Sequence, residues 1–515
     1  MEGKLELRAG TPNDTTREYL PEAIYGSDMV INEAGNNSIP WNPRLKKCQE
    51  SLVDPGETDT WYEYVPESYD GTRAVPLVVG LHGGLMTGWG HSAYTSWTMV
   101  ADREGLICVF PDAEQGRVWA VEGVFDGKEG EGDRIFTPKV PKEKKDNHDL
   151  NMLLALIRRM QDKYRIDPGR IFMQGMSMGN LMTHMFTRYY GKILAGSAGS
   201  ACSSYAKVLF DDHYQVKNES GPVAVWQSRP ENNGVPAAAD KAEESAVNRY
   251  NRWYWMKING CDTIPRIRID GEDNFAFYRG KYADQVFLDI KNRDHGQTLD
   301  EAFLCWDYFF SGLTRNPDGT ITMSETVLPR EGDSYAAAFA EGADLVWWHN
   351  KPQKLSAVPV LWQKRKYHGL NGGQIVRGEY LCVPVRFLAE MAGGEFIPSE
   401  DTLTAEIHLP DGRLLQFARG SIGCLIDNRL RSMSCEALHR NGELLVSIEW
   451  FARAILNVTV TKCSGVVYVT DHFAVLSTFM ADLIRDILTG QADPASYDRL
   501  MREDVKRTER SGDGR

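Results

Sequence analysis

The chain has 515 residues, of which 42% are hydrophobic and 25% charged, and its net charge is −13. This length exceeds what one hydrophobic core usually serves, so the sequence predicts two or three globular domains. The acidic balance disfavours nucleic acids and anionic membrane surfaces as partners, because both are bound through basic patches. No apolar run approaches the ~20 residues that span a bilayer, so no integral membrane segment is expected.

The compartment is inferred from the start of the chain and from its cysteines. Residues Met1 to Leu7 lack the basic flank and apolar run of a secretory signal. The nine cysteines are odd in number and contain no C-x-x-C pair, which favours reduced thiols. These features favour a cytoplasmic protein, although removal of a leader would leave the same start.

The first half of the chain predicts an α/β domain. Residues 1–56 are rich in Asn, Pro, Gly and Glu and predict an irregular N-terminal segment. From Thr60 onward, apolar strands alternate with amphipathic helices, one of them predicted over 149–164, and this alternation is typical of a mostly parallel sheet. Turn residues at 315–319 mark its end, so the domain is expected over 57–313 and a linker over 314–355.

The second half predicts a smaller α+β domain with an internal duplication. The run from Val383 to Glu390 is echoed by the run from Val446 to Arg453, and each enters an apolar helix and then a strand. The duplicated domain is expected over 356–475, followed by a C-terminal helix and charged tail over 476–515.

The pentapeptide Gly-Met-Ser-Met-Gly at 175–179 carries the pattern G-x-S-x-G. It lies between a β-rich run at 170–173 and a helical run at 181–186. Strand, sharp turn and helix form the context in which this pattern becomes a nucleophile elbow, with the serine hydroxyl exposed at the turn. Ser177 is therefore the predicted nucleophile.

A serine nucleophile needs a base and donors for the oxyanion. Leu-His-Gly-Gly at 81–84 follows a buried strand, and the N–H groups of Gly84 and Met178 are the predicted oxyanion donors. His82 is interpreted as a residue that shapes this loop. His295, on a loop between a strand and the closing helix, is the predicted general base.

The acid that orients the base is expected in the loop after the strand at 222–226. Glu231 is the first acid there and is the predicted third member of the triad, with Asp240 and Asp262 as alternatives. Trp119 and Trp89 are the predicted substrate-binding residues. Trp119 begins a Gly- and Lys-rich stretch at 115–147 that interrupts the α/β rhythm and could cover the site.

Further motifs accompany the elbow, and they are Tyr64 to Gly71, Ala101 to Gly105, Phe110 to Asp112, Asp149 and Ile166 to Pro168. On these motifs, residues from about 60 to 313 resemble α/β-hydrolase esterases of the polyhydroxybutyrate depolymerase and feruloyl esterase-like group. The resemblance implies an α/β-hydrolase fold and ester hydrolysis through an acyl-enzyme, with Ser177 and His295 on its motif positions. The family usually shows an Asp where this chain has Asn232, beside Glu231.

Residues from about 356 to 475 resemble the duplicated domain named after the N-terminal region of copper amine oxidases, which often accompanies bacterial envelope proteins. The run from Val383 to Glu390 carries this likeness. His408, His439 and His472 lack the close spacing of metal ligands and are interpreted as ordinary histidines. The resemblance implies binding, domain packing, oligomer formation or an envelope contact.

The sequence therefore predicts a serine carboxylic-ester hydrolase for a small or polymeric ester, without cofactor or metal. The same residues would serve an acyltransferase or a peptidase, depending on whether the pocket excludes water or admits an amide. A third interpretation is an inactive hydrolase fold that acts as a binding or scaffold protein, supported by the unusual acid loop.

Overall fold

The computed structural model describes Leu5 and residues 42–114, 118–124, 140–232, 241–368 and 373–512. The chain divides into two compact units. Unit 1 consists of Met1–Pro265, Phe275–Glu331 and Tyr497–Arg515, and unit 2 consists of Arg266–Asn274 and Gly332–Ser496. The sequence placed domain limits near 313 and 356 and did not foresee that each unit is built from separate segments of chain.

Unit 1 contains a mixed sheet with the strand order β1-β2-β4-β3-β5-β6-β7-β10-β9. Strands β4, β3, β5, β6, β7 and β10 run parallel, whereas β1 and β2 pair antiparallel at one edge. The bounds are β1 (Lys46–Glu50), β2 (Asp59–Tyr64), β3 (Val75–Leu81), β4 (Ile107–Pro111), β5 (Ile166–Met176), β6 (Gly196–Ser200), β7 (Ala224–Asn232), β9 (Asp273–Tyr278) and β10 (Gln285–Asp294). The predicted α/β class with a mostly parallel sheet is confirmed.

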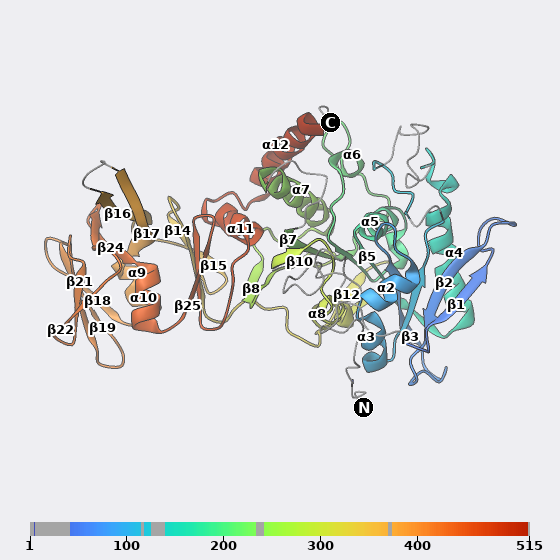
Figure 1. Ribbon diagram of the computed structural model, residues 1–515, viewed down its shortest axis with the longest axis horizontal. Helices are drawn as coiled ribbons and strands as arrows, with labels where there is room; N and C mark the ends of the chain where they lie inside the picture. Colours follow the sequence, from blue (N-terminus) through green and yellow to red (C-terminus); the bar gives the residue numbers. More distant parts are fainter. Residues whose placement is uncertain are drawn as a thin grey trace. The chain divides into compact units, whose positions relative to one another are not determined.

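Helices cover both faces of this sheet, with α3 and α8 together on one face and α5 and α7 on the other (Figure 1). The helices of unit 1 are α2 (Gly88–Tyr94), α3 (Trp97–Glu104), α4 (His148–Lys163), α5 (Met178–Tyr190), α6 (Ala206–Leu209), α7 (Lys241–Asn259), α8 (Glu301–Tyr308) and α12 (Pro494–Gly512), with short 3₁₀ turns at Lys144–Asp146, Gly191–Ile193 and Phe310–Gly312 and a small hairpin of β11 (Leu313–Arg315) and β12 (Ile321–Met323). Strand β3 is buried along its whole length, as a sheet covered on both faces requires.

The predicted helix before the elbow is confirmed as α4. Its buried residues include Leu150, Leu153, Ile157 and Met160, which recur every three or four positions and form one apolar face. Asn147 caps its start, because its side chain accepts a hydrogen bond from the N–H of Leu150.

The expectation that residues 1–56 are wholly irregular is wrong for Lys46–Glu50. These residues form β1 and pair with β2, from Lys46 opposite Glu63 to Glu50 opposite Asp59. Apart from a half-buried Cys48, every side chain of β1 is exposed. An edge strand with no buried face carries no apolar alternation, so sequence periodicity could not identify it.

The last helix, α12, packs against α7 within unit 1. The ring of Tyr497 stacks on Trp253 at a centroid distance of 5.1 Å. Asp498 pairs with Lys257 at 2.9 Å, and Asp504 pairs with Arg249 at 2.8 Å. The charged residues of the expected tail therefore serve, in part, as partners of α7.

Unit 2 contains three antiparallel sheets, with the orders β15-β14-β13-β26-β25, β16-β17-β24-β23 and β18-β19-β20-β21-β22. Its elements are β8 (Arg266–Asp270), β13 (Ala336–Ala340), β14 (Leu345–Trp348), β15 (Lys351–Lys354), β16 (Val360–His368), β17 (Gly373–Pro384), α9 (Val385–Met391), β18 (Glu395–Pro398), β19 (Thr404–His408), β20 (Leu414–Ala418), β21 (Gly423–Ile426), β22 (Arg429–Ser432), β23 (Leu438–Arg440), β24 (Glu443–Ser447), α10 (Ile448–Phe451), a π-helical turn at Ala452–Leu456, β25 (Thr459–Cys463), β26 (Val466–Thr470) and α11 (Thr478–Leu488).

The two echoed sequence runs have the same local structure. In each, a strand enters a short helix and then a hairpin, as β17-α9-β18-β19 and as β24-α10-β25-β26. Pro384 and Ser447 precede the two helices with nearly equal backbone angles, φ −56°, ψ 129° and φ −55°, ψ 120°. Strands β17 and β24 also pair with each other, with Val383 opposite Val446.

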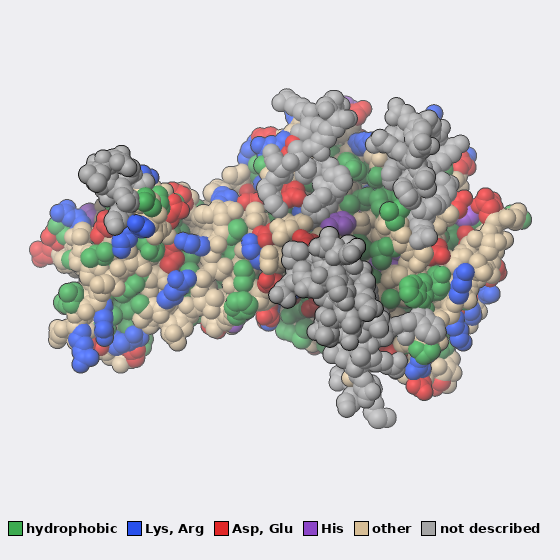
Figure 2. All heavy atoms as spheres, in the orientation of Figure 1, with side chains coloured by type: hydrophobic (Ala, Val, Ile, Leu, Met, Phe, Trp, Pro, Cys, Tyr) green, Lys and Arg blue, Asp and Glu red, His purple; other side chains and the backbone are tan. Residues whose placement is uncertain are grey.

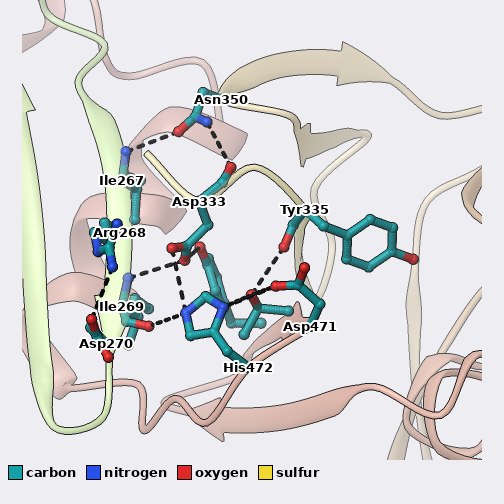
Figure 3. Close-up of polar contacts among 11 residues, drawn as sticks. Ile267, Arg268, Ile269, Asp270, Asp333, Tyr335, Asn350, Asp471 and His472 are labelled. Carbon is teal, nitrogen blue, oxygen red and sulfur yellow. Dashed lines mark hydrogen bonds and ion pairs between the residues drawn. The ribbon is translucent and has the colours of Figure 1, made fainter. Parts of the chain in front are cut away.

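A buried carboxylate, Asp333, fastens the detached segment 266–274 into unit 2 (Figure 3). Asp333 accepts hydrogen bonds from the N–H of Ile269 at 3.1 Å and from the hydroxyl of Tyr468 at 2.7 Å. The imidazole Nε2 of His472 lies 2.8 Å from the carbonyl oxygen of Ile269. These tertiary contacts explain why the segment belongs to unit 2, and no local sequence pattern predicts them.

We expect Tyr497→Ala to lower the free energy of unfolding of unit 1 by about 3 kcal/mol, the usual cost of removing a large buried ring. The ring is 1% exposed and stacks on Trp253, so truncation leaves a cavity between α12 and α7. Urea unfolding followed by fluorescence measures the change. The control is Arg499→Ala, whose exposed side chain pairs with Glu503 on the same helix. Equal losses for both variants would contradict the packing described for α12.

Candidate active site

The elbow predicted at 175–179 joins β5 to α5 and holds Ser177 in an unusual backbone conformation. Ser177 has φ 56° and ψ −116°, a region that a residue with a side chain rarely adopts. Its N–H donates to the carbonyl oxygen of Ser200 at 2.9 Å, which continues the pairing of β5 with β6. The turn therefore lifts Ser177 out of the end of a central strand.

Two close backbone approaches make this turn possible, and both require glycine. A Cβ atom on Gly175 would lie 2.1 Å from the carbonyl oxygen of Gly179. A Cβ atom on Gly179 would lie 2.2 Å from the carbonyl oxygen of Leu81. The second contact also brings the start of α5 against the end of β3, where the loop with Gly84 begins.

Ser177 and His295 are brought together by the fold. The Nε2 atom of His295 lies 2.9 Å from Oγ of Ser177, although 118 residues separate them in sequence. His295 directly follows β10 and Ser177 directly follows β5, and both strands belong to the parallel part of the sheet. The hydroxyl and the imidazole are therefore at hydrogen-bond distance, with the histidine exposed to solvent.

The two residues predicted as oxyanion donors are neighbours. A Cβ atom on Gly84 would lie 3.2 Å from Cγ of Met178, so the backbone of the 81–84 loop meets the first residue of α5. Met178 also follows Ser177 directly, at the start of a 13-residue helix. Backbone N–H groups at a helix start are not used by the helix itself and favour negative charge.

His82 is buried and shapes the loop, as the sequence predicted. Its Nε2 accepts a hydrogen bond from the N–H of Ala113 at 3.0 Å, and its Nδ1 therefore carries the proton that faces the carbonyl oxygen of Gly83 at 2.7 Å. Both ring nitrogens are used in holding the loop, which leaves His82 unsuited to act as the base.

The structure does not support Trp119 as a substrate-contacting residue. Its indole is 0% exposed, its Nε1 donates to the carbonyl oxygen of His82 at 2.8 Å, and its ring lies 4.9 Å from that of His82. Trp119 therefore packs against His82 and stabilises the 81–84 loop. The stretch at 115–147 that was expected to cover the site lies mostly outside the described residues.

Trp89 remains suited to contact a substrate, because its side chain is 45% exposed at the start of α2. Leu85, in the preceding loop and next to Gly84, is 52% exposed. Large apolar side chains exposed within a few residues of a predicted oxyanion donor offer a surface to the apolar part of a ligand.

Glu231 is the penultimate residue of β7 and is buried, with 5% exposure. Its Oε1 pairs with the ammonium of Lys291 at 2.8 Å, and its Oε2 accepts a hydrogen bond from the N–H of Asn292 at 3.2 Å. Both partners lie on β10, three and four residues before His295. The carboxylate is thus held at the correct edge of the sheet, by the strand that carries the predicted base.

The two alternative acids differ in position. Asp240 lies outside the described residues. Asp262 donates its N–H to the carbonyl oxygen of Arg279, in the turn that precedes β10. His295 follows the other end of this ten-residue strand, a distance of roughly 30 Å at ~3.3 Å per residue, so Asp262 is badly placed to orient it.

A buried carboxyl that the sequence did not indicate, Glu301, lies beside the elbow. It is 2% exposed, and the hydroxyl of Ser200, whose carbonyl binds Ser177, donates a hydrogen bond to it. Burial raises the pKa of Glu301 to about 7. No sequence motif marks Glu301, because its raised pKa results from burial against β6, which local sequence does not encode.

One group of the described residues has the composition of a metal site. Asp54, Glu57 and His148 bring one ligand atom each within 4.8 Å of one another, but both carboxylates are exposed. The Nε2 of His148 lies 2.7 Å from a carboxylate oxygen of Asp59. Burial opposes the charge on this ring, yet the hydrogen bond to Asp59 raises the pKa of His148, so contacts between a histidine and carboxylates account for the group.

The three histidines of the second half are each engaged by neighbours. His408 lies 3.1 Å from Glu406, His439 lies 2.9 Å from the hydroxyl of Thr402, and His472 binds the carbonyl oxygen of Ile269.

On the face shown in Figure 2, acidic and basic side chains are interspersed. Within the described residues, no helix is long and apolar enough to cross a membrane.

Comparison with curated proteins relates the chain to esterases, whereas no family model matches it. It is 26% identical over 166 residues to a bifunctional acetylxylan esterase/xylanase of Neocallimastix patriciarum, covering 32% of this chain and 21% of that protein. It is 25% identical over 159 residues to poly(3-hydroxyalkanoate) depolymerase C of Paucimonas lemoignei, covering 30% and 33%. It is 23% identical over 256 residues to feruloyl esterase B of Piromyces equi, covering 47% and 43%. The chain thus spans less than half the length of each.

Solved structures of esterases are distantly similar. An acetyl xylan esterase from Aspergillus awamori matches with a TM-score of 0.36 and 15% identity, over 51% of this chain and 97% of that one. A ferulic acid esterase from Anaeromyces mucronatus matches with a TM-score of 0.32 and 16% identity, over 52% and 93%. Because these similarities are low, inference about function depends on the geometry of the site.

We expect Gly175→Ala to lower the free energy of unfolding by at least about 2 kcal/mol, because the added methyl group would overlap the carbonyl of Gly179 and force the backbone apart. Thermal unfolding measures the loss. Gly90→Ala is the matched control, since its methyl group would meet nothing closer than 3.5 Å in α2. A Gly175→Ala protein as stable as the control would show that the elbow is not packed as described.

Proposed function

We propose that the chain is a serine carboxylic-ester hydrolase that works through an acyl-enzyme. The observation that carries the proposal is the 2.9 Å contact between Oγ of Ser177 and Nε2 of His295 at the end of a glycine-packed elbow. A serine hydroxyl is a weak nucleophile unless an adjacent base takes its proton, and this pair supplies both groups. The relation to three ester-cleaving proteins supports the same chemistry.

In the proposed reaction, Oγ of Ser177 attacks the ester carbonyl carbon while His295 accepts the hydroxyl proton. The N–H groups of Gly84 and Met178 donate to the oxyanion of the tetrahedral intermediate. The C–O bond to the alcohol then breaks, and His295 returns the proton to the leaving oxygen. Water repeats the sequence on the acyl-enzyme and releases the acid, so no cofactor or metal takes part.

Glu231 is proposed as the acid that orients His295, with Asp240 as the alternative. Glu231 lies one residue before the end of β7, which is next to β10 in the sheet, and its contacts to Lys291 and Asn292 hold it near the base. In a serine triad, the acid fixes the tautomer of the histidine and stabilises the imidazolium that forms.

The substrate is proposed to be a carboxylic ester with an apolar acyl or alcohol part. Trp89 and Leu85, both exposed beside the loop of Gly84, are the proposed contact residues. For unit 2, the repeated strand, helix and hairpin support the proposal that it is a duplicated binding or assembly module.

Ser177→Ala is expected to lower kcat for p-nitrophenyl acetate by at least about 10³-fold, because removal of a triad nucleophile leaves only binding and oxyanion stabilisation. A fluorophosphonate probe should label Ser177 in the unaltered protein and not in the variant. An unchanged rate in Ser177→Ala, or an unaltered protein that takes up no label, would favour the scaffold interpretation. Transfer of the acyl group to added alcohols instead of water would indicate an acyltransferase.

Glu231→Gln is expected to lower kcat by up to about 10⁴-fold with little change in KM, since the amide favours the wrong tautomer of His295. Asp240→Asn serves as the comparison and should stay within a few-fold of the unaltered rate. Both variants are assayed with the same ester, and their thermal unfolding is compared. The reverse outcome would move the role of the acid to Asp240.

A further inference from the structure

A buried network of hydrogen bonds lies directly beneath the Ser177–His295 pair and is centred on Gln174. Gln174 belongs to β5, three residues before Ser177, and is 2% exposed. The network, named here the Gln174 network, consists of His91 and Tyr94 of α2, Trp97 of α3, Gln174, and Gln297 of the loop after β10.

The orientation of the Gln174 amide follows from its partners. The indole Nε1 of Trp97 lies 3.2 Å from Oε1 of Gln174, and an indole N–H can only donate. The Nε2 of His91 lies 3.1 Å from the same oxygen, so the ring must be protonated on Nε2. Burial lowers the pKa of His91 to about 3, so the ring is neutral. The NH₂ group of Gln174 is therefore left to face the other way.

That NH₂ group donates to Oε1 of Gln297 at 2.9 Å. Gln297 is two residues after His295, in a stretch without regular secondary structure, and is itself 2% exposed. Its backbone N–H is also held, by the hydroxyl of Tyr94 at 3.2 Å. The loop that carries the exposed His295 is thus held to the interior two residues further along, at Gln297.

The network joins the three segments that the proposed reaction needs. Gln174 lies on the strand that leads to Ser177, and Gln297 lies on the loop of His295. His91 and Tyr94 lie on α2, which follows the loop of Gly84. Because a buried amide that loses its partner pays the full cost of desolvation, this arrangement resists displacement of any one segment.

We propose that Gln174 and Gln297 are positioning residues, whose amide-to-amide hydrogen bond holds the loop of His295 at reacting distance from Ser177. This inference rests on the proposed function. Gln174 lies three residues before Ser177 and Gln297 lies two residues after His295, so each acts through the backbone that carries a catalytic side chain. A misplacement of about 1 Å at the base can cost a factor of up to ~10² in rate, so loss of the bond is expected to act on kcat.

The test compares Gln297→Leu with a matched control elsewhere in the same sheet. Gln285 is 0% exposed and donates from Nε2 to Oε1 of Gln227 at 2.7 Å, but it lies at the start of β10, nine residues before its end. Gln285→Leu therefore removes the same kind of amide bond far from His295. Gln297→Leu is expected to lower kcat for p-nitrophenyl acetate by about 10- to 100-fold with KM little changed, and to slow fluorophosphonate labelling of Ser177 in parallel. Gln285→Leu should stay within about 2-fold in both assays while losing comparable thermal stability.

Two further variants keep the test decisive. Gln297→Glu retains an oxygen that accepts from Gln174, whether or not the new carboxyl is ionised, and is therefore expected to restore most of kcat. Gln297→Asn, whose shorter side chain leaves the acceptor out of reach, replaces Gln297→Leu if that variant does not fold.

The outcomes separate this proposal from the proposed function. An unaltered protein that neither hydrolyses the ester nor labels at Ser177 overturns both. An unaltered protein that is active, together with a Gln297→Leu variant that keeps its kcat or loses no more than Gln285→Leu, overturns the positioning role alone. A loss in Gln297→Leu that Gln297→Glu does not repair would likewise assign the effect to packing rather than to the hydrogen bond.

Discussion

The conformation of Ser177 is the constraint on which the rest of the site depends. Its φ of 56° and ψ of −116° cost of order 1–3 kcal/mol for a residue with a side chain, so the surrounding structure must impose them. Contacts around the turn impose these angles. Gly175 and Gly179 allow backbone segments to approach at distances that any Cβ atom would prevent, and the N–H of Ser177 donates to the carbonyl oxygen of Ser200. The same contacts press the start of α5 against the end of β3.

The parallel sheet then determines which other residues can reach this serine. Strands β5, β7 and β10 run in one direction, so the residues at or after their carboxyl ends gather at one edge. Ser177, Glu231 and His295 occupy these positions. The same geometry disfavours Asp262, which lies near the amino end of β10, and it favours an acid at the end of β7 or directly after it.

The features that could be predicted from the sequence are those that a local sequence pattern encodes. The elbow pentapeptide, the loop after β3 and the helix α4 each combine a turn or cap with an apolar period, and the structure has all three where they were expected. His82 is interpreted from sequence as a residue that shapes this loop, and both of its ring nitrogens are engaged there. By contrast, the exposed edge strand β1 carries no apolar pattern, so its residues appeared irregular.

The errors share a physical cause, which is that burial depends on contacts distant in sequence. Trp119 appeared suited to a pocket because large aromatic side chains often line one, yet its indole N–H is taken up by the carbonyl of His82. The segment 266–274 belongs to unit 2 only because Asp333 and His472 bind it there. The open assignment of the acid has a different cause: Asn232 stands near the place where the resembled family usually has an Asp, so the motif does not identify the residue.

The candidate site combines the solvent-accessible pair of Ser177 and His295 with a buried polar support, and the two have opposite physical requirements. In the proposed reaction His295 must meet solvent and substrate, so little packing can hold its side chain. Its loop must therefore be fixed below the surface, and polar groups can do this only where every amide orientation is determined by a partner, as Trp97 and His91 determine that of Gln174. Glu301 is a second buried polar group next to the elbow, and it too is held by a partner, since the hydroxyl of Ser200 donates to it. Burial raises the pKa of Glu301 to about 7, so its charged form is disfavoured where a hydroxyl donor is the partner that the fold provides.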